Sequence, residues 1–182
     1  MIARSGATMR TRENEPPLPE PLAYFITWST YGTWLPGDER GWVEFRHGWK
    51  MPDAARNLEA AARMTEDACR LDARQRQAVE EQMGETCKYR GWHLYAVNCR
   101  SNHMHFVVAA VAKPQLVRAR LKAWCTRRLK AVEKQRLGSD GTGFVRGNWW
   151  AERGSQRFIN DDDGLESALL YVRDAQDGPR FQ

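Results

Sequence analysis

The chain has 182 residues, a formal net charge of +5 and 42% apolar residues. This length predicts one domain with a sizeable core, and the lack of any run of about 18 apolar residues excludes a membrane-spanning helix. Residues 1–12 lack the apolar h-region of a secretory signal. The four cysteines are dispersed and form no Cys-x-x-Cys pair. This pattern disfavours a zinc knuckle and predicts reduced thiols in a cytoplasmic protein.

The N-terminal part is expected to be an arm followed by a strand. Residues 1–21 are polar, end in four prolines and are predicted to be flexible, so that residues 22–182 form the domain. Ala23 to Leu35 is rich in aromatic and β-branched residues and predicts the first strand, which Pro36-Gly37-Asp38 ends as a turn. The segment 39–52 has no assignable pattern.

A long helical region and a hairpin are expected next. Asp53 to Arg90 has helix-forming composition; the main helix is expected to begin at Thr65-Glu66-Asp67, to end near Gly91 and to pack on a sheet. Trp92 to Cys99 alternates and predicts a strand, and Arg100-Ser101-Asn102 is the expected turn into a second one. In that alternation one side comprises Trp92, Leu94, Ala96 and Asn98, and the other His93, Tyr95, Val97 and Cys99.

The second strand of this hairpin carries two of the four histidines. Because residues i and i+2 of a strand point to one face, His103 and His105 are expected side by side, with Met104 and Phe106 packed on the opposite face. Two neighbouring imidazoles are potential ligands of a divalent ion. His-x-His is a short motif, however, and by itself it favours two polar histidines on a solvent-facing strand; the rest of the chain reverses this preference.

A strongly basic helix is predicted from Lys113 to Arg136. One apolar face is expected, formed by Val117, Leu121, Trp124, Leu129 and Val132. A helix face that is only solvated usually mixes charges, whereas this one is almost entirely cationic, so we predict a surface that binds DNA phosphates. The expected DNA-binding residues are Lys113, Arg118, Arg120, Lys122, Arg127, Arg128 and Lys130.

In the C-terminal part of the sequence, Arg157-Phe158-Ile159 predicts a short strand. A last helix is expected to start near Asp163 and to end before Gly178-Pro179. Its apolar stripe comprises Leu165, Ala168, Leu169 and Val172, with Tyr171 beside it. The glycine-rich loop before this part lacks the Gly-Lys-Ser/Thr ending of a nucleotide-binding loop, so no nucleotide cofactor is expected.

The order strand, helix, strand, strand, helix, strand predicts an α+β, ferredoxin-like fold: a β-α-β-β-α-β antiparallel sheet with two helices on one face, followed by the tyrosine-bearing C-terminal helix. The His-x-His strand would lie inside the sheet, with its other face open to a substrate.

The sequence resembles the single-tyrosine HUH transposases, which include small insertion-sequence transposases and the REP-associated tyrosine transposases. The resemblance depends on Asn102-His103-Met104-His105-Phe106-Val107-Val108, on the aromatic strand Phe25-Ile26-Thr27-Trp28 and on the late Tyr171-Val172-Arg173. It covers roughly residues 24–176.

The resemblance implies a transposase that nicks and rejoins single-stranded DNA, with hairpin ends or palindromic repeats. His103 and His105 would bind Mg²⁺ or Mn²⁺, and Tyr171 would be the nucleophile that forms a 5′-phosphotyrosine. A homodimer is also expected, since family members often combine the histidines of one subunit with the tyrosine helix of the other.

One position departs from the family pattern. A Gln or Asn often follows the tyrosine by four residues and completes the metal site, but here that position is Ala175 and the amide is at Gln176. A residue five positions on lies about 140° around a helix, so Gln176 could be the third ligand only if the helix has already unwound. Asp174 is the rival. The unusual spacing leaves open an inactive or host-domesticated single-stranded nucleic-acid-binding protein of the same fold. A relaxase or replication initiator also uses this chemistry, but normally carries further domains.

Overall fold

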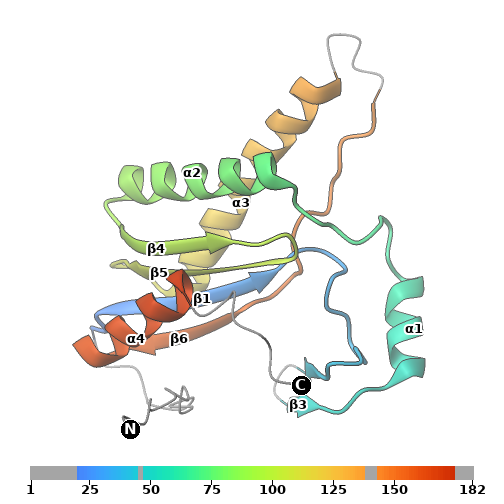
Figure 1. The fold of residues 1–182 in the computed structure, drawn as a ribbon, viewed down its shortest axis with the longest axis horizontal. Coiled ribbons are helices and arrows are strands. Elements are labelled where there is room, and N and C mark those ends of the chain that lie inside the picture. Colours follow the sequence, from blue (N-terminus) through green and yellow to red (C-terminus); the bar gives the residue numbers. More distant parts are fainter. Residues whose placement is uncertain (1–19, 45–46, 138–142, 175–182) are drawn as a thin grey trace, which may run out of the picture.

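The computed structural model describes residues 20–44, 47–137 and 143–174. Its centre is an antiparallel four-stranded sheet in the order β4-β5-β1-β6. Its strands are β1 (Ala23–Ser29), β4 (His93–Cys99), β5 (His103–Ala109) and β6 (Ser155–Ile159). The two strands β1 and β5 occupy the middle, so the histidine-bearing strand lies inside the sheet as predicted (Figure 1).

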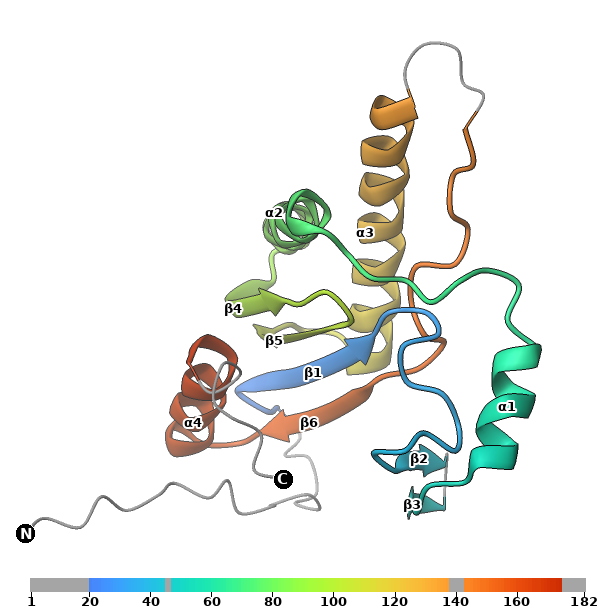
Figure 2. The same ribbon diagram turned by 45° about the vertical axis from the view of Figure 1, so that its right-hand side comes forward.

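Helices cover both faces of this sheet. The two long helices α2 (Ala73–Arg90) and α3 (Pro114–Leu137) lie on one face, and α4 (Asp162–Arg173) lies on the other (Figure 2). This arrangement confirms the predicted ferredoxin-like α+β fold with an additional C-terminal helix. No helix in the described ranges is long and apolar enough to cross a bilayer.

Strand alternation divides the core into two clusters. On the side of α2 and α3, the sheet contributes large side chains to a first cluster. These are Tyr24, Ile26, Trp28, Met104, Phe106 and Val108. The opposite side chains of the same strands form a second, smaller cluster under α4. Its buried members are Ala23, Phe25, Val107, Ile159, Ala168 and Val172, and the last two confirm the apolar stripe predicted for the last helix.

The helical region 53–90 is interrupted, contrary to the prediction. It forms a short helix α1 (Ala54–Ala62), a non-helical segment and then α2. The predicted start of the main helix at Thr65 is wrong, because Asp72 caps α2 with a reciprocal capping box to Gln75. The predicted end is confirmed: Gly91 terminates α2 in the left-handed conformation, with φ of 66°.

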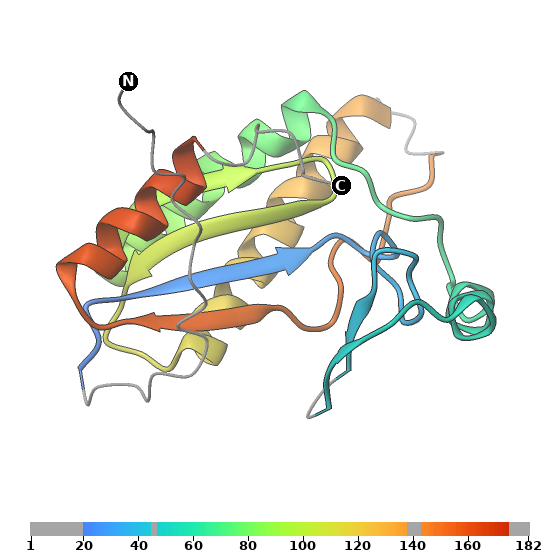
Figure 3. The ribbon, with the colours of Figure 1, turned by 60° about the horizontal axis from the view of Figure 1, so that its bottom comes forward.

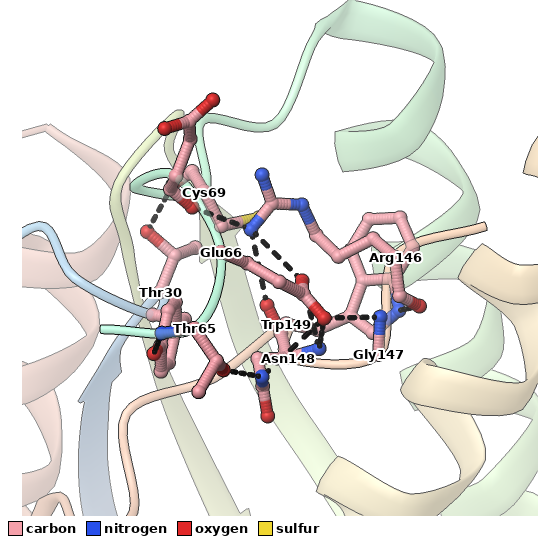
Figure 4. Close-up of polar contacts among 10 residues, drawn as sticks. Thr30, Thr65, Glu66, Cys69, Arg146, Gly147, Asn148 and Trp149 are labelled. Carbon is pink, nitrogen blue, oxygen red and sulfur yellow. Dashed lines mark hydrogen bonds and ion pairs between the residues drawn. The ribbon is translucent and has the colours of Figure 1, made fainter. Parts of the chain in front are cut away.

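Polar contacts explain why residues 63–72 do not continue the helix. The Glu66 carboxylate accepts hydrogen bonds from the backbone N–H groups of Gly147 and Asn148, at 3.0 and 3.2 Å (Figure 4). The Thr30 hydroxyl donates to the carbonyl oxygen of Cys69, at 2.6 Å. These partners are distant in sequence, so local helix propensity is overridden by tertiary contacts.

The first strand is also shorter than predicted, and the segment after it has a structure that was not predicted. β1 ends at Ser29 instead of Leu35, although the turn at Gly37 is present, with φ of 82°. The unassigned segment 39–52 contains a small hairpin, β2 (Trp42–Glu44) and β3 (Gly48–Lys50). The predicted arm, residues 1–21, lies outside the described residues except for its last two.

Candidate active site

The two histidines of β5 share one face of the sheet, as predicted. Their ring centroids are 4.8 Å apart and nearly perpendicular, whereas Met104 and Phe106 are fully buried on the other face. In the strand register, His105 lies opposite Thr27 of β1 and Asn98 of β4. The pair is therefore fixed by strands on both sides, and a rigid support of this kind suits a ligand-binding site.

The hydrogen bond of His103 selects a ring tautomer. Its Nδ1 lies 2.7 Å from the side-chain oxygen Oδ1 of Asn102. An amide oxygen only accepts hydrogen bonds, so Nδ1 donates and Nε2 of the neutral ring carries the lone pair. A second residue that orients an imidazole in this way is typical of histidines that bind metals.

His105 is held in its neutral form. Burial, and to a smaller extent the nearby charges of His103 and Arg100, lower the pKa of His105 to about 3. Its Nδ1 is buried and has no hydrogen-bond partner in the described parts of the chain. A neutral imidazole with an unsatisfied buried nitrogen has the donor chemistry that a divalent metal ion requires. The two histidines therefore fit such an ion, although the described residues contain no group of three or more His, Cys, Asp or Glu that could hold one.

Tyr171 of α4 contacts this histidine directly. The ring centroids of Tyr171 and His105 are 5.5 Å apart, in an edge-to-face arrangement. Phe25 of β1 contacts both, stacked on His105 at 5.9 Å and edge-on to Tyr171 at 5.7 Å. The three rings fix the tyrosine relative to the histidine pair. Phe25 belongs to the aromatic strand that supported the resemblance, but its contacts with these two rings were not predicted; their only sequence signal is an apolar side chain on the histidine face.

Asn98 anchors the end of the helix that carries Tyr171. Its side-chain amide donates a hydrogen bond to the carbonyl oxygen of Val172, at 3.0 Å. Helix α4 begins at the other end with Asp161, whose carboxylate accepts from the backbone N–H of Gly164. The first contact attaches α4 to the sheet one residue from the tyrosine, and the second fixes where the helix begins. The sequence gave no signal for this role beyond a polar residue in a strand.

The third metal ligand stays a prediction. Gln176 lies outside the described residues. Asp174 is the C-cap of α4, which ends at Arg173, before the predicted stop at Gly178-Pro179. The backbone N–H of Asp174 still bonds to the carbonyl oxygen of Leu170, at 2.8 Å.

The basic helix α3 lies on the face of the sheet opposite to α4 (Figure 2). The histidines are on the α4 side, where His105 contacts Tyr171. Its buried face contains Cys125 where Trp124 was predicted. Trp124 is instead half-buried, with the Arg127 guanidinium 4.8 Å from its ring. The structure therefore does not bring the predicted DNA-binding residues together with His103, His105 and Tyr171.

Three of the seven predicted DNA-binding side chains form hydrogen bonds or ion pairs within the described parts of the protein. Arg118 donates to the carbonyl oxygen of Gly154, at 2.8 Å, and Arg128 forms an ion pair with Glu81, at 3.4 Å. The Lys122 ammonium donates to the carbonyl oxygens of Ala151 and Arg153, at 2.7 and 2.8 Å, and burial lowers its pKa to about 8. The other four, Lys113, Arg120, Arg127 and Lys130, are exposed. Contact of these residues with DNA stays a prediction.

The fold and the site together define a ferredoxin-like domain whose central strand presents two histidines to a tyrosine on a C-terminal helix. A solved structure with a similar backbone is a REP-associated tyrosine transposase bound to a REP hairpin. It is 12% identical, with a TM-score of 0.50 over 89% of this chain and 70% of the other. A transposase candidate from Deinococcus radiodurans R1 is 15% identical, with a TM-score of 0.45 over 87% of this chain and 94% of the other.

No family model and no curated protein matches the sequence. At such low identity, the likeness to the REP-associated tyrosine transposase shows a shared fold. It therefore confirms, at the level of the fold, the resemblance that the His-x-His strand and the late tyrosine indicated.

Proposed function

We propose that this protein is a DNA transposase that nicks and rejoins single-stranded DNA through a 5′-phosphotyrosine. The observation that carries the proposal is the contact of Tyr171 with His105, whose ring centroids are 5.5 Å apart. A nucleophile and two potential metal ligands thus meet on one face of one sheet. The similar structure bound to a REP hairpin supports a substrate with hairpin ends or palindromic repeats.

The histidines would bind Mg²⁺ or Mn²⁺. Two neutral imidazoles fit such an ion only together with oxygen ligands, for which Gln176, Asp174 and the DNA phosphate are the proposed sources. When bound, the ion would polarise the scissile phosphate. The protein's own contribution is to keep the His105 imidazole neutral through burial and to orient the His103 ring through its hydrogen bond to Asn102.

Tyr171 would perform the covalent step. Its hydroxyl oxygen forms a bond to the phosphorus, the bond from phosphorus to the 3′ oxygen breaks, and the tyrosine proton is lost while the 3′ oxygen leaves as a hydroxyl. The 5′ end of the cut strand stays attached to the protein. Attack by another 3′-hydroxyl reverses these bond changes and joins the strand without ATP.

A second function has its own support. The chain would be a single-stranded nucleic-acid-binding protein without nicking activity if no third ligand completes the metal site. The +5 position of Gln176 favours this alternative.

One experiment separates the two functions. Single-stranded oligonucleotides that cover both strands of the DNA flanking the gene are labelled at the 3′ end and incubated with the protein and Mg²⁺ or Mn²⁺. If the protein is a transposase, the labelled strand should stay attached to the denatured protein, and both EDTA and the Tyr171→Phe substitution should abolish this adduct. Tyr89→Phe is the matched control, because Tyr89 is 81% exposed on α2, away from the histidines. Binding without any adduct would favour the nucleic-acid-binding protein.

A further inference from the structure

Arg157 of β6 lies on the same face of the sheet as the histidines. In the strand register it is opposite Phe25, and its guanidinium carbon is 5.3 Å from the centroid of the Phe25 ring. This ring is the one that contacts both His105 and Tyr171. Figure 3 shows this side of the sheet, where β1 and β6 run next to each other clear of α4. The cation is therefore one aromatic ring away from the proposed nucleophile.

The guanidinium of Arg157 has no carboxylate partner within the described residues. Other arginines of the chain do have one: Arg40 pairs with Asp38, Arg136 with Asp72 and Arg146 with Glu66. Arg157 is half-exposed, and its guanidinium is positioned by the aromatic face of Phe25. A planar cation with five donors held in this way is suited to a phosphate group.

Two hydroxyl groups extend the polar surface between Arg157 and the histidines. Thr27 of β1 lies opposite both His105 and Ser155 in the register, and its hydroxyl oxygen is 2.6 Å from that of Ser155. This pair is exposed. Hydroxyl and guanidinium donors next to each other are common partners of the DNA backbone.

We propose that Arg157, together with the Thr27–Ser155 hydroxyl pair, forms a subsite that binds one backbone phosphate of single-stranded DNA at the cut. The bound phosphate is the scissile one or one of its two neighbours. This inference rests on the proposed function, because it assigns a substrate-binding role beside the same histidines and tyrosine. Arg157 would position the strand by charge and hydrogen bonds.

The test combines Arg157→Gln with oligonucleotides that carry a neutral methylphosphonate at the scissile phosphate or at either neighbour. With the natural strand, the variant should lower kcat/KM for adduct formation about 10- to 100-fold, the usual value of a hydrogen bond to a charged group. The loss should disappear when the methylphosphonate replaces the phosphate that Arg157 binds. The control is Arg90→Gln, because the Arg90 guanidinium lies over the exposed Tyr89 ring, at 5.9 Å, and should change kcat/KM less than about twofold.

The outcomes separate this subsite from the proposed function. The subsite alone is overturned if wild type forms the adduct and Arg157→Gln is as active as wild type. It is likewise overturned if the variant is impaired to the same extent on all three methylphosphonate oligonucleotides. If wild type forms no adduct, binding is measured instead with a methylphosphonate at each position of the tightest-bound oligonucleotide. If the methylphosphonate lowers the affinity of wild type but not of Arg157→Gln at one position, the subsite is supported without nicking. If no position shows this difference, the subsite is refuted.

Discussion

Tyr171 and His105 of one and the same chain lie edge to face, with ring centroids 5.5 Å apart. The resemblance to the HUH transposases left open whether the tyrosine helix serves its own subunit or a partner. In this structure, Phe25 fills the space beside both rings, and Asn98 bonds to the helix backbone next to the tyrosine. The proposed site is thus complete in its histidines and tyrosine without a second chain.

We therefore predict that subunits do not share sites, even if the expected homodimer forms. A mixture of the His103→Ala and Tyr171→Phe proteins should form no more adduct than the two proteins separately. Light scattering of the mixture establishes whether dimers are present, and co-purification with two different tags establishes that subunits have exchanged. Partial recovery of adduct in mixed dimers would instead show that the tyrosine acts on the partner's histidines.

Asn98 provides a test of how precisely α4 must be positioned. Asn98→Ala removes the hydrogen bond to the Val172 carbonyl oxygen, and the expected loss of stability is about 1 kcal/mol. The rate of adduct formation should fall further, by about tenfold or more, because small displacements of a nucleophile are costly. The measurements are urea unfolding and the single-turnover rate. A rate that follows only the loss of folded protein would assign Asn98 a purely structural role.

Much of the fold was predictable because local patterns and tertiary contacts agree. The alternation around His103 and His105 places them on one face, since Met104 and Phe106 are large enough to require the core. The apolar stripe of the last helix likewise specifies which side of α4 meets the sheet. The tyrosine could be located beside that stripe, but its contact with His105 depends on the crossing of α4 over the sheet, which no local pattern encodes.

The sequence-based predictions of secondary structure were wrong where an irregularity interrupts a regular strand or helix. In β4 a bulge shifts the register between Leu94 and Ala96, so Tyr95 and Ala96 both pack against the second cluster. The predicted alternation therefore fails in the middle of the strand, although Asn98 still reaches the histidine face. A bulge has no reliable sequence signal, and neither do the long-range contacts of Glu66 that interrupt the helical region.

Lys122 exemplifies a charge whose role composition cannot reveal. Its ammonium donates to the carbonyl oxygens of Ala151 and Arg153, at 2.7 and 2.8 Å, just before β6. We predict that Lys122→Met lowers stability by about 1 to 3 kcal/mol, because these carbonyl groups lose their partner. The salt dependence of DNA binding should not change. Urea unfolding and a salt titration test the two statements, and a changed slope with unchanged stability would return Lys122 to the DNA-binding surface.

The pH dependence gives a second measurement on the same variant. Burial lowers the pKa of Lys122 to about 8, from 10.5 in the unfolded chain. Between these values the unfolded chain binds more protons, so this group makes stability rise with pH. The stability difference between wild type and Lys122→Met should therefore grow from pH 7.5 to pH 9.5. A constant difference would mean that folding does not lower the pKa of Lys122.

The exposed cations of α3 carry the last prediction. Arg120, Arg127 and Lys134 are seven residues apart and all exposed, so they form one stripe along the helix, on the far side of the sheet from the histidines. If DNA phosphates bind there, the Arg120→Gln, Arg127→Gln double variant should have a flatter plot of log affinity for single-stranded DNA against log salt concentration. The slope should decrease in magnitude by about 1.4, or about 0.7 for each lost phosphate contact. The rate of adduct formation at saturating DNA should not change, because neither residue reaches the site.

Arg136→Gln is the matched control for the stripe. Arg136 also belongs to α3, but its guanidinium pairs with Asp72, at 2.7 Å, so it differs from the stripe residues in having a carboxylate partner. Its replacement should leave the slope within experimental error while lowering stability by up to about 1 kcal/mol. An equal change of slope in control and stripe variants would reflect overall charge. An unchanged slope in the stripe double variant would mean that the bound strand stays on the face that carries His103 and Arg157, and that α3 serves only to pack the sheet.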